Sequence, residues 1–151
     1  MFLKLRKKLI IFIKNKFFLY FMSKIKSVIF DLYETLLYCS DKTNPYARLF
    51  NDFNFSKEEK KNAKHLALTE NFEFLSDLVR KVKPGYEPEL VTYKDDLRLE
   101  LSSARLYPET EKVLEKLNKK GFKLGLISNL ATPYKTPFYD FGLDKYFERF
   151  A

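Results

Sequence analysis

Cysteine and histidine are nearly absent from this sequence. Among its 151 residues it has one of each, Cys39 and His65. A disulfide needs a second cysteine, and a zinc site made of cysteine and histidine needs about four such ligands, so the chain alone supplies neither. We therefore expect a fold held together by its hydrophobic core, in a reducing compartment such as the cytoplasm.

Long apolar runs and acidic residues are missing from the start of the chain. Residues 1–21 contain no acid, and the apolar run from Leu9 to Ile13 has only five residues before Lys14 interrupts it. A helix that crosses a bilayer needs about 20 apolar residues. A secretory signal also needs a small-residue cleavage site, and none precedes Met22. These absences predict neither a transmembrane helix nor a signal peptide here.

The positive charge is concentrated in this basic leader, residues 1–21. Six basic residues lie in it, and without them the net charge falls from +8 to +2. The nearly balanced remainder argues against nucleic-acid binding. Two interpretations of the leader stay open: a basic amphipathic helix that lies on a membrane surface, or an AT-rich untranslated stretch before a true start at Met22. We favour the second, because Met22 stands just before the first predicted strand.

Two apolar stretches predict strands that end in polar side chains. The stretch from Ser27 to Asp31 predicts a buried strand with a carboxylate at its end. The stretch from Phe122 to Ser128 predicts a second strand, which Asn129 follows. Ligands of open α/β sheets bind at the carboxyl ends of the strands, so a functional site is expected there.

The sequence between these strands is helical in pattern. Pro45 suits a first helical turn, and Ser56 begins a capping box that starts another helix. Residues 83–88 contain two prolines and a glycine, which predict a turn or linker. A further helix over residues 110–120 is expected to end at Gly121. The length and the 46% hydrophobic content suit one α/β domain with a small inserted module.

The segment from Val28 to Leu37 reads Val-Ile-Phe-Asp-Leu-Tyr-Glu-Thr-Leu-Leu. It resembles motif I of the haloacid dehalogenase-like (HAD) superfamily, in which Asp-x-(Asp or Tyr)-x-(Thr or Val) follows a hydrophobic strand. Asp31 falls on the nucleophile of that motif. Tyr33 and Thr35 fall on its second and third positions.

The strand that ends in Ser128 resembles motif II of the same superfamily, which ends in serine or threonine. Together the two motifs resemble a HAD hydrolase over about residues 24–150. The resemblance implies a Rossmann-like α/β core, present only as its front half, with an inserted helical cap of the C1 type. The implied parts are a leader, the core in two pieces, and the cap: residues 1–21, 22–40 with 105–151, and 41–104.

The resemblance implies hydrolysis through an aspartyl intermediate. Asp31 would attack the phosphorus of a small phosphate ester, or the halide-bearing carbon of an organohalide. Ser128 would donate a hydrogen bond to the nucleophile or the transferred group, and Thr35 and Asn129 would bind substrate. In phosphatases of the family, magnesium is held by the nucleophile, by the backbone carbonyl two residues later, here that of Tyr33, and by a motif IV acid.

Tyr33 departs from the phosphatase pattern. Phosphatases of the superfamily usually carry a second aspartate here, which acts as general acid and base. Tyrosine, with a reference pKa of about 10, replaces it poorly at neutral pH. Dehalogenases tolerate tyrosine because a halide leaves without a proton. The choice between the two substrate classes therefore stays open.

Each candidate also has a purely structural interpretation. Asp31 could serve as a turn former, the pair after the second strand could simply begin a loop, and Thr35 could brace the turn. Motif III and motif IV are not recognisable after Ser128, since Lys135 and Lys145 resemble surface lysines. The strand that should flank the first one in the family is also missing, which predicts an open sheet edge. We therefore expect a truncated sequence, and an inactive fragment or scaffold of the family is the alternative function.

Overall fold

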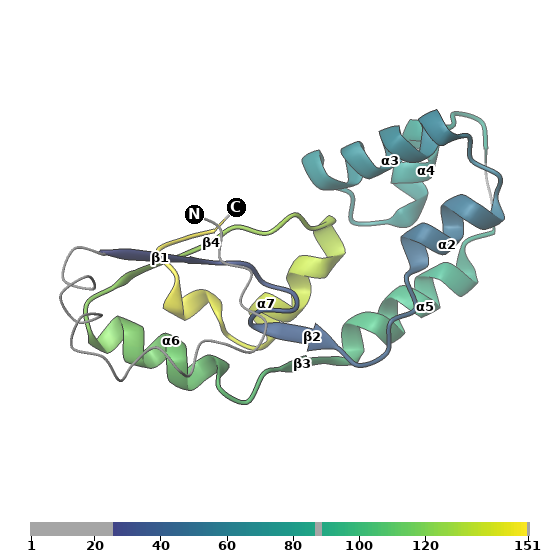
Figure 1. Cartoon of the computed structure of the whole chain (residues 1–151). Helices are drawn as coiled ribbons and strands as arrows, with labels where there is room; N and C mark the ends of the chain where they lie inside the picture. The colour runs from purple at the N-terminus through teal and green to yellow at the C-terminus, as the bar shows by residue number, and fades with distance from the viewer. Residues whose placement is uncertain (1–25, 87–88, 151) are drawn as a thin grey trace. The chain divides into compact units, whose positions relative to one another are not determined.

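The structure is a computed structural model that describes residues 26–86 and 89–150. The predicted basic leader lies outside the described residues. The chain divides into two compact units, which are described separately below (Figure 1). We call the first the sheet unit and the second the helical unit. Of the described residues, the sheet unit contains 26–38, 105–128 and 141–150. The helical unit consists of Cys39–Ala104 and Asn129–Asp140.

A three-stranded parallel sheet forms the centre of the sheet unit. Its strands are β1 (Ser27–Phe30), β4 (Lys123–Leu126) and β5 (Arg149–Phe150), in the order β1-β4-β5. Ser27 lies opposite Lys123 and Phe30 lies opposite Leu126, so β1 and β4 end side by side. The sequence predicts β1 and β4. The structure adds β5, where Arg149 pairs with Gly125.

One face of this sheet is buried and the other is open in the part that the structure describes. Helix α6 (Thr110–Lys119) packs against β4, and Phe30, Leu124 and Leu126 are buried. Ile29, which points to the opposite face, is 62% exposed. The prediction of a buried strand at residues 27–31 is therefore wrong for alternate residues. Successive side chains of a strand point to opposite faces, and the described residues cover only one of them.

The segment after β1 is helical, as the sequence predicts. It contains α2 (Pro45–Asp52), α3 (Lys57–Thr69), α4 (Leu75–Val82) and α5 (Val91–Ser102). The predicted capping box is confirmed: Ser56 Oγ accepts from the Glu59 amide at 3.2 Å, and Glu59 Oε2 accepts from the Ser56 amide at 2.7 Å. Hydrogen bonds to Ser56 lower the pKa of the Glu59 carboxyl, which favours its charged form at the helix start.

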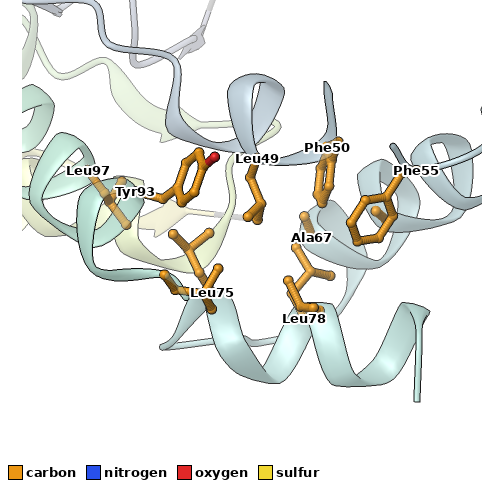
Figure 2. Packing of buried hydrophobic residues seen from close by; sticks show 11 residues of the cluster. Leu49, Phe50, Phe55, Ala67, Leu75, Leu78, Tyr93 and Leu97 are labelled. Carbon is orange, nitrogen blue, oxygen red and sulfur yellow. The ribbon is translucent and has the colours of Figure 1, made fainter. Parts of the chain in front are cut away.

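A single hydrophobic cluster holds the helical unit together. It draws residues from α2, α3, α4 and α5 and from the segments between them. Figure 2 shows these side chains interdigitating between the helices. The ones it labels are Leu49, Phe50, Phe55, Ala67, Leu75, Leu78, Tyr93 and Leu97. Most of them are almost completely removed from water, so this insertion has a core of its own.

Two short strands connect the units. Strand β2 (Leu37–Cys39) pairs with β3 (Ala104–Leu106) in a two-stranded sheet, and the division between the units passes through both strands. Next to them, the buried Glu100 accepts three hydrogen bonds on Oε2, at 2.8 to 3.1 Å. Their donors are the Thr43 amide, the Thr43 hydroxyl and the Asn44 amide. The start of α2 is thereby held to α5.

The remaining elements follow β4. They are the 3₁₀ turns η2 (Thr132–Lys135) and η3 (Asp144–Tyr146) and the short helix α7 (Thr136–Asp140). Gly121 has a φ of +79°, which confirms its predicted place just after α6, where a left-handed residue ends the helix. In residues 26–86 and 89–150, every helix is too short or too polar to cross a membrane.

Candidate active site

Asp31 and Ser128 meet at the carboxyl ends of two neighbouring strands. Asp31 directly follows β1, and Ser128 lies two residues after β4. The Ile127 amide donates to the Phe30 carbonyl at 2.9 Å, which extends the pairing to the point where both side chains emerge. Ser128 Oγ donates a hydrogen bond to Asp31 Oδ1 at 2.6 Å. This length is typical of a hydroxyl bound to a charged carboxylate.

The hydrogen bonds that the described residues donate to the Asp31 carboxylate share one oxygen. The Leu32 amide donates to the same Oδ1 at 2.8 Å, so both donors lie on that atom. Among the described residues, no donor is bonded to Oδ2. Asp31 as a residue is exposed. Two donors thus orient the carboxylate through Oδ1, while no donor among the described residues is bonded to Oδ2.

A tight turn carries Tyr33 and Thr35. The Leu36 and Leu37 amides both donate to the Leu32 carbonyl, at 2.8 and 3.2 Å, which closes the turn. The three leucines are buried and anchor it in the sheet unit. Tyr33 and Thr35 lie between these anchors and are partly exposed. The backbone of Tyr33, two residues after Asp31, also forms an isolated β-bridge with Leu37. This bridge fixes the backbone of Tyr33 in the turn.

The start of α6 supports this turn, which sequence reasoning missed. The buried Thr110 donates through Oγ1 to the Leu36 carbonyl at 2.7 Å, and the Tyr107 amide donates to the same oxygen at 3.1 Å. Local sequence patterns could not reveal this support, because Leu36 and Thr110 lie 74 positions apart in the chain.

Among the described residues, the others singled out in the sequence form no hydrogen bond with the side chains of Asp31 and Ser128. Asn129 is the first residue of the later stretch of the helical unit, whereas Asp31 and Ser128 belong to the sheet unit. Cys39 is buried and forms no disulfide, and His65 is exposed on α3. Lys135 and Lys145 are exposed, as predicted, and Lys145 Nζ lies 4.0 Å from Glu111 Oε1.

A family model for haloacid dehalogenase-like hydrolases matches residues 25–151. The chain belongs to this family. The match begins just before β1 and covers both of the motifs that the sequence suggested. The HAD-like resemblance inferred from Asp31 and Ser128 is therefore confirmed at the level of the family. Comparison with curated protein sequences gives no match.

Solved structures of HAD proteins share the fold of this chain. One is a predicted phosphoglycolate phosphatase from Haemophilus somnus, with 20% identity and a TM-score of 0.50 over 85% of this chain and 63% of that one. Another is a HAD family enzyme from Bacteroides thetaiotaomicron, with 13% identity and a TM-score of 0.57 over 83% of this chain and 67% of that one. At such identities the likeness concerns the fold alone. The HAD-like chain spans about two thirds of the length of these structures, or slightly less.

The family typically uses magnesium, and the oxygen atoms beside Asp31 suit that ion in kind. Its carboxylate and the Tyr33 carbonyl are hard oxygen donors, which Mg²⁺ prefers, with water and substrate phosphate as further ligands. The number of such ligands near Asp31 is, however, too small for a complete site among the described residues. Within residues 26–86 and 89–150, no three acidic, histidine or cysteine side chains gather closely enough to hold a metal ion. The described part of the HAD-like chain thus does not hold a complete set of side-chain ligands for such an ion.

Proposed function

We propose that this chain carries the nucleophile of a HAD-like hydrolase, with Asp31 acting on a small phosphate ester or an organohalide. The observation that carries the proposal is the 2.6 Å hydrogen bond from Ser128 to Asp31 at the ends of two parallel strands. It orients the carboxylate of an exposed residue through one oxygen. A merely structural turn former does not need a donor supplied from a strand nearly a hundred residues away.

The chain's own residues would act in a fixed order. Asp31 Oδ2 would attack phosphorus or carbon, forming a covalent bond to the aspartate while the bond to the leaving alcohol or halide breaks. The two hydrogen bonds to Oδ1, from the Leu32 amide and Ser128 Oγ, would hold the carboxylate in a fixed orientation. Water would then hydrolyse the aspartyl intermediate. Magnesium, when held by Asp31, the Tyr33 carbonyl and an acid from outside the described residues, would offset charge on the phosphoryl oxygens.

Tyr33 favours a leaving group that departs without a proton. An alcohol leaves a phosphate ester readily only when an acid protonates it, and a tyrosine at the second motif position is a weak acid at neutral pH. A halide needs no such help. Organohalides and phosphate esters with acidic leaving groups are therefore the substrates that this motif suits best.

The domain assignment forms part of the same proposal. The parallel sheet with α6 supports a Rossmann-like core formed by residues 22–40 and 105–151, of which the stretch Asn129–Asp140 packs with the helical unit. The separate hydrophobic cluster of the four helices supports a C1-type cap at residues 41–104. The partner of such a protein would be a small-molecule substrate in the cytoplasm.

A second candidate function is an inactive member of the family that keeps the fold without turnover. It is favoured by the missing acid cluster around Asp31 in the described part of the chain. The two candidate functions predict different behaviour towards an activated electrophile. If Asp31 is a nucleophile it reacts with the electrophile, and if the chain is inactive it does not.

Halide release tests the proposal. The purified chain is incubated with a neutral haloacetamide and with a haloacid, and free halide is measured beside the Asp31→Asn variant. We expect release that the variant lacks. Cys39, a possible source of background alkylation, is buried and present in both proteins, so it cancels in the comparison. Equal release from both proteins contradicts a nucleophilic role for Asp31.

A further inference from the structure

The turn that follows Asp31 contains a strained residue. Glu34 has a φ of +57°, a left-handed conformation that residues other than glycine adopt at a cost. The Glu34 amide donates to the Leu37 carbonyl at 2.8 Å, and the Leu36 and Leu37 amides close the turn on the Leu32 carbonyl. A strained backbone persists when the surrounding structure holds it in place. The closed form of this turn therefore needs support from outside.

The start of α6 supplies that support, and both segments belong to the sheet unit. Thr110, which is 3% exposed, donates through Oγ1 to the Leu36 carbonyl at 2.7 Å. The same carbonyl already accepts from the Tyr107 amide at 3.1 Å, so it is not left unsatisfied without Thr110. The hydroxyl acts as a second donor. Two donors on one oxygen fix the direction of the peptide group between Leu36 and Leu37.

Leu32 links this peptide group to the nucleophile. Its carbonyl accepts from the Leu37 amide at 3.2 Å, and that amide belongs to the peptide group whose oxygen Thr110 holds. Its own amide donates to Asp31 Oδ1 at 2.8 Å. The Leu32 side chain is buried, so the residue is also fixed by packing. Hydrogen bonds thus lead from α6 to the Asp31 carboxylate within one unit, and bonds in such series strengthen one another.

We propose that Thr110 is a positioning residue for Asp31, whose hydroxyl keeps the Leu32 amide on the carboxylate through the peptide group between Leu36 and Leu37. The catalytic meaning of this inference rests on the proposed role of Asp31. The positioning itself can be measured without any substrate. If Thr110 only stabilised the packing of α6, its loss would weaken the whole unit and leave the orientation of Asp31 unchanged.

The first test is amide hydrogen exchange of the full ¹⁵N-labelled chain, with Thr110→Val as the main variant. Valine keeps the shape of the side chain and removes the donor. We expect exchange at the Leu36 and Leu37 amides to accelerate roughly fivefold to tenfold, as loss of one hydrogen bond predicts. The Ile127 amide, which donates to the Phe30 carbonyl in the sheet, should exchange as in the parent. General destabilisation would accelerate all three amides.

The chemical shift of the Leu32 amide reports the contact with Asp31 directly. It should move in Thr110→Val and return in Thr110→Ser, which restores the hydroxyl. Thr69→Val is the matched control. Its hydroxyl donates to the His65 carbonyl at 2.8 Å within α3, in the helical unit, so its removal should change neither readout.

The second test measures how fast a neutral haloacetamide forms an ester with Asp31 in the same folded variants. We expect the rate to fall about tenfold in Thr110→Val, because attack depends on orientation, and to recover in Thr110→Ser. If the parent forms no ester, the proposed function of Asp31 fails, while the exchange and shift data still decide the positioning.

The proposal is overturned if folded Thr110→Val leaves the Leu36 and Leu37 exchange and the Leu32 shift as in the parent. If Thr110→Val fails to fold, Thr110→Ser decides. Parent-like exchange at Leu36 and Leu37 would then support a role for the hydroxyl. Fast exchange at these amides with the hydroxyl in place would overturn it.

Discussion

Replacing Glu100 by glutamine should loosen the connection through which the chain enters the helical unit. Helix α2 begins after Asn44, whose φ is +50° and whose side chain makes no capping hydrogen bond. Glu100 takes over the missing cap from α5, because its Oε2 accepts from Thr43 twice and from the Asn44 amide. The glutamine variant keeps the shape and an acceptor oxygen but loses the charge.

The expected loss follows from these three hydrogen bonds. A hydrogen bond to a charged group contributes roughly 1 kcal/mol more than one between neutral groups. Three such bonds give an upper value of about 3 kcal/mol. The donors are only partly buried, so we expect Glu100→Gln to lower the free energy of unfolding by about 2 kcal/mol. With a urea m-value of about 2 kcal/mol/M, the midpoint should fall by about 1 M.

The assay is urea unfolding followed by far-UV circular dichroism, with Asp95→Asn as the control. Asp95 is an exposed carboxylate on the same helix, paired with Arg98 at 3.2 Å, and such surface pairs contribute about 0 to 1 kcal/mol. The control should therefore shift the midpoint little. If the two variants differ by less than about 0.5 kcal/mol, the Glu100 network does not stabilise the start of α2, and the reasoning is refuted.

Three further predictions concern the leader, Tyr33 and catalysis by the chain itself. Deleting residues 1–21 should leave the helical circular dichroism of the rest intact. In a protein that also supplies motifs III and IV, Tyr33→Asp should raise phosphatase turnover by about 100-fold, the lower end of what a positioned general acid contributes. The 151-residue chain with magnesium should hydrolyse an aryl phosphate no faster than its Asp31→Asn variant. Without the lysine of motif III and the magnesium-binding acid of motif IV, the Asp31 carboxylate would have to approach an anionic phosphate. Two like charges at about 4 Å repel by roughly 4 kcal/mol at an effective dielectric near 20, which slows the reaction on the order of a thousandfold.

Each of the three has a clear contradicting result. Loss of the circular dichroism signal on deletion would show that the leader packs on the core. Unchanged phosphatase turnover in Tyr33→Asp, with halide release by the parent, would assign the site to organohalides. Aryl phosphate turnover above the Asp31→Asn level would mean that a lysine of the chain, Lys135 or Lys145 being the candidates, substitutes for motif III.

Local rules predicted the parts of the fold that depend on neighbours along the chain. The capping box at Ser56 and the left-handed Gly121 are examples, because each needs only a few consecutive residues. Strands β2 and β3 were missed. They have three residues each and pair across more than sixty positions, so neither shows a periodicity of its own. The exposure of Ile29 was missed as well, because covering a sheet face depends on distant segments.

The candidate site also contains features that neighbouring residues predict and features that depend on distant segments. Two apolar strands that end in polar residues predicted that Asp31 and Ser128 would lie at one edge of a sheet, and the structure brings them to 2.6 Å. Their catalytic roles remain predictions. Sequence reasoning could not find Thr110, which supports the turn after Asp31. This contact joins segments far apart in the chain, and threonine is common enough to carry no signal alone.

The most direct measurement of the central claim is to locate the covalent bond that Asp31 is proposed to form. The full chain is treated with a neutral haloacetamide, digested and mapped by mass spectrometry, with Asp31→Asn and an Asp41→Asn control in parallel. Asp41 is another exposed aspartate, ten positions further along the chain. We expect an ester on the peptide that contains Asp31, absent from Asp31→Asn and unchanged in Asp41→Asn. Labelling spread evenly over exposed carboxylates, or no label on Asp31, would contradict its role as the nucleophile.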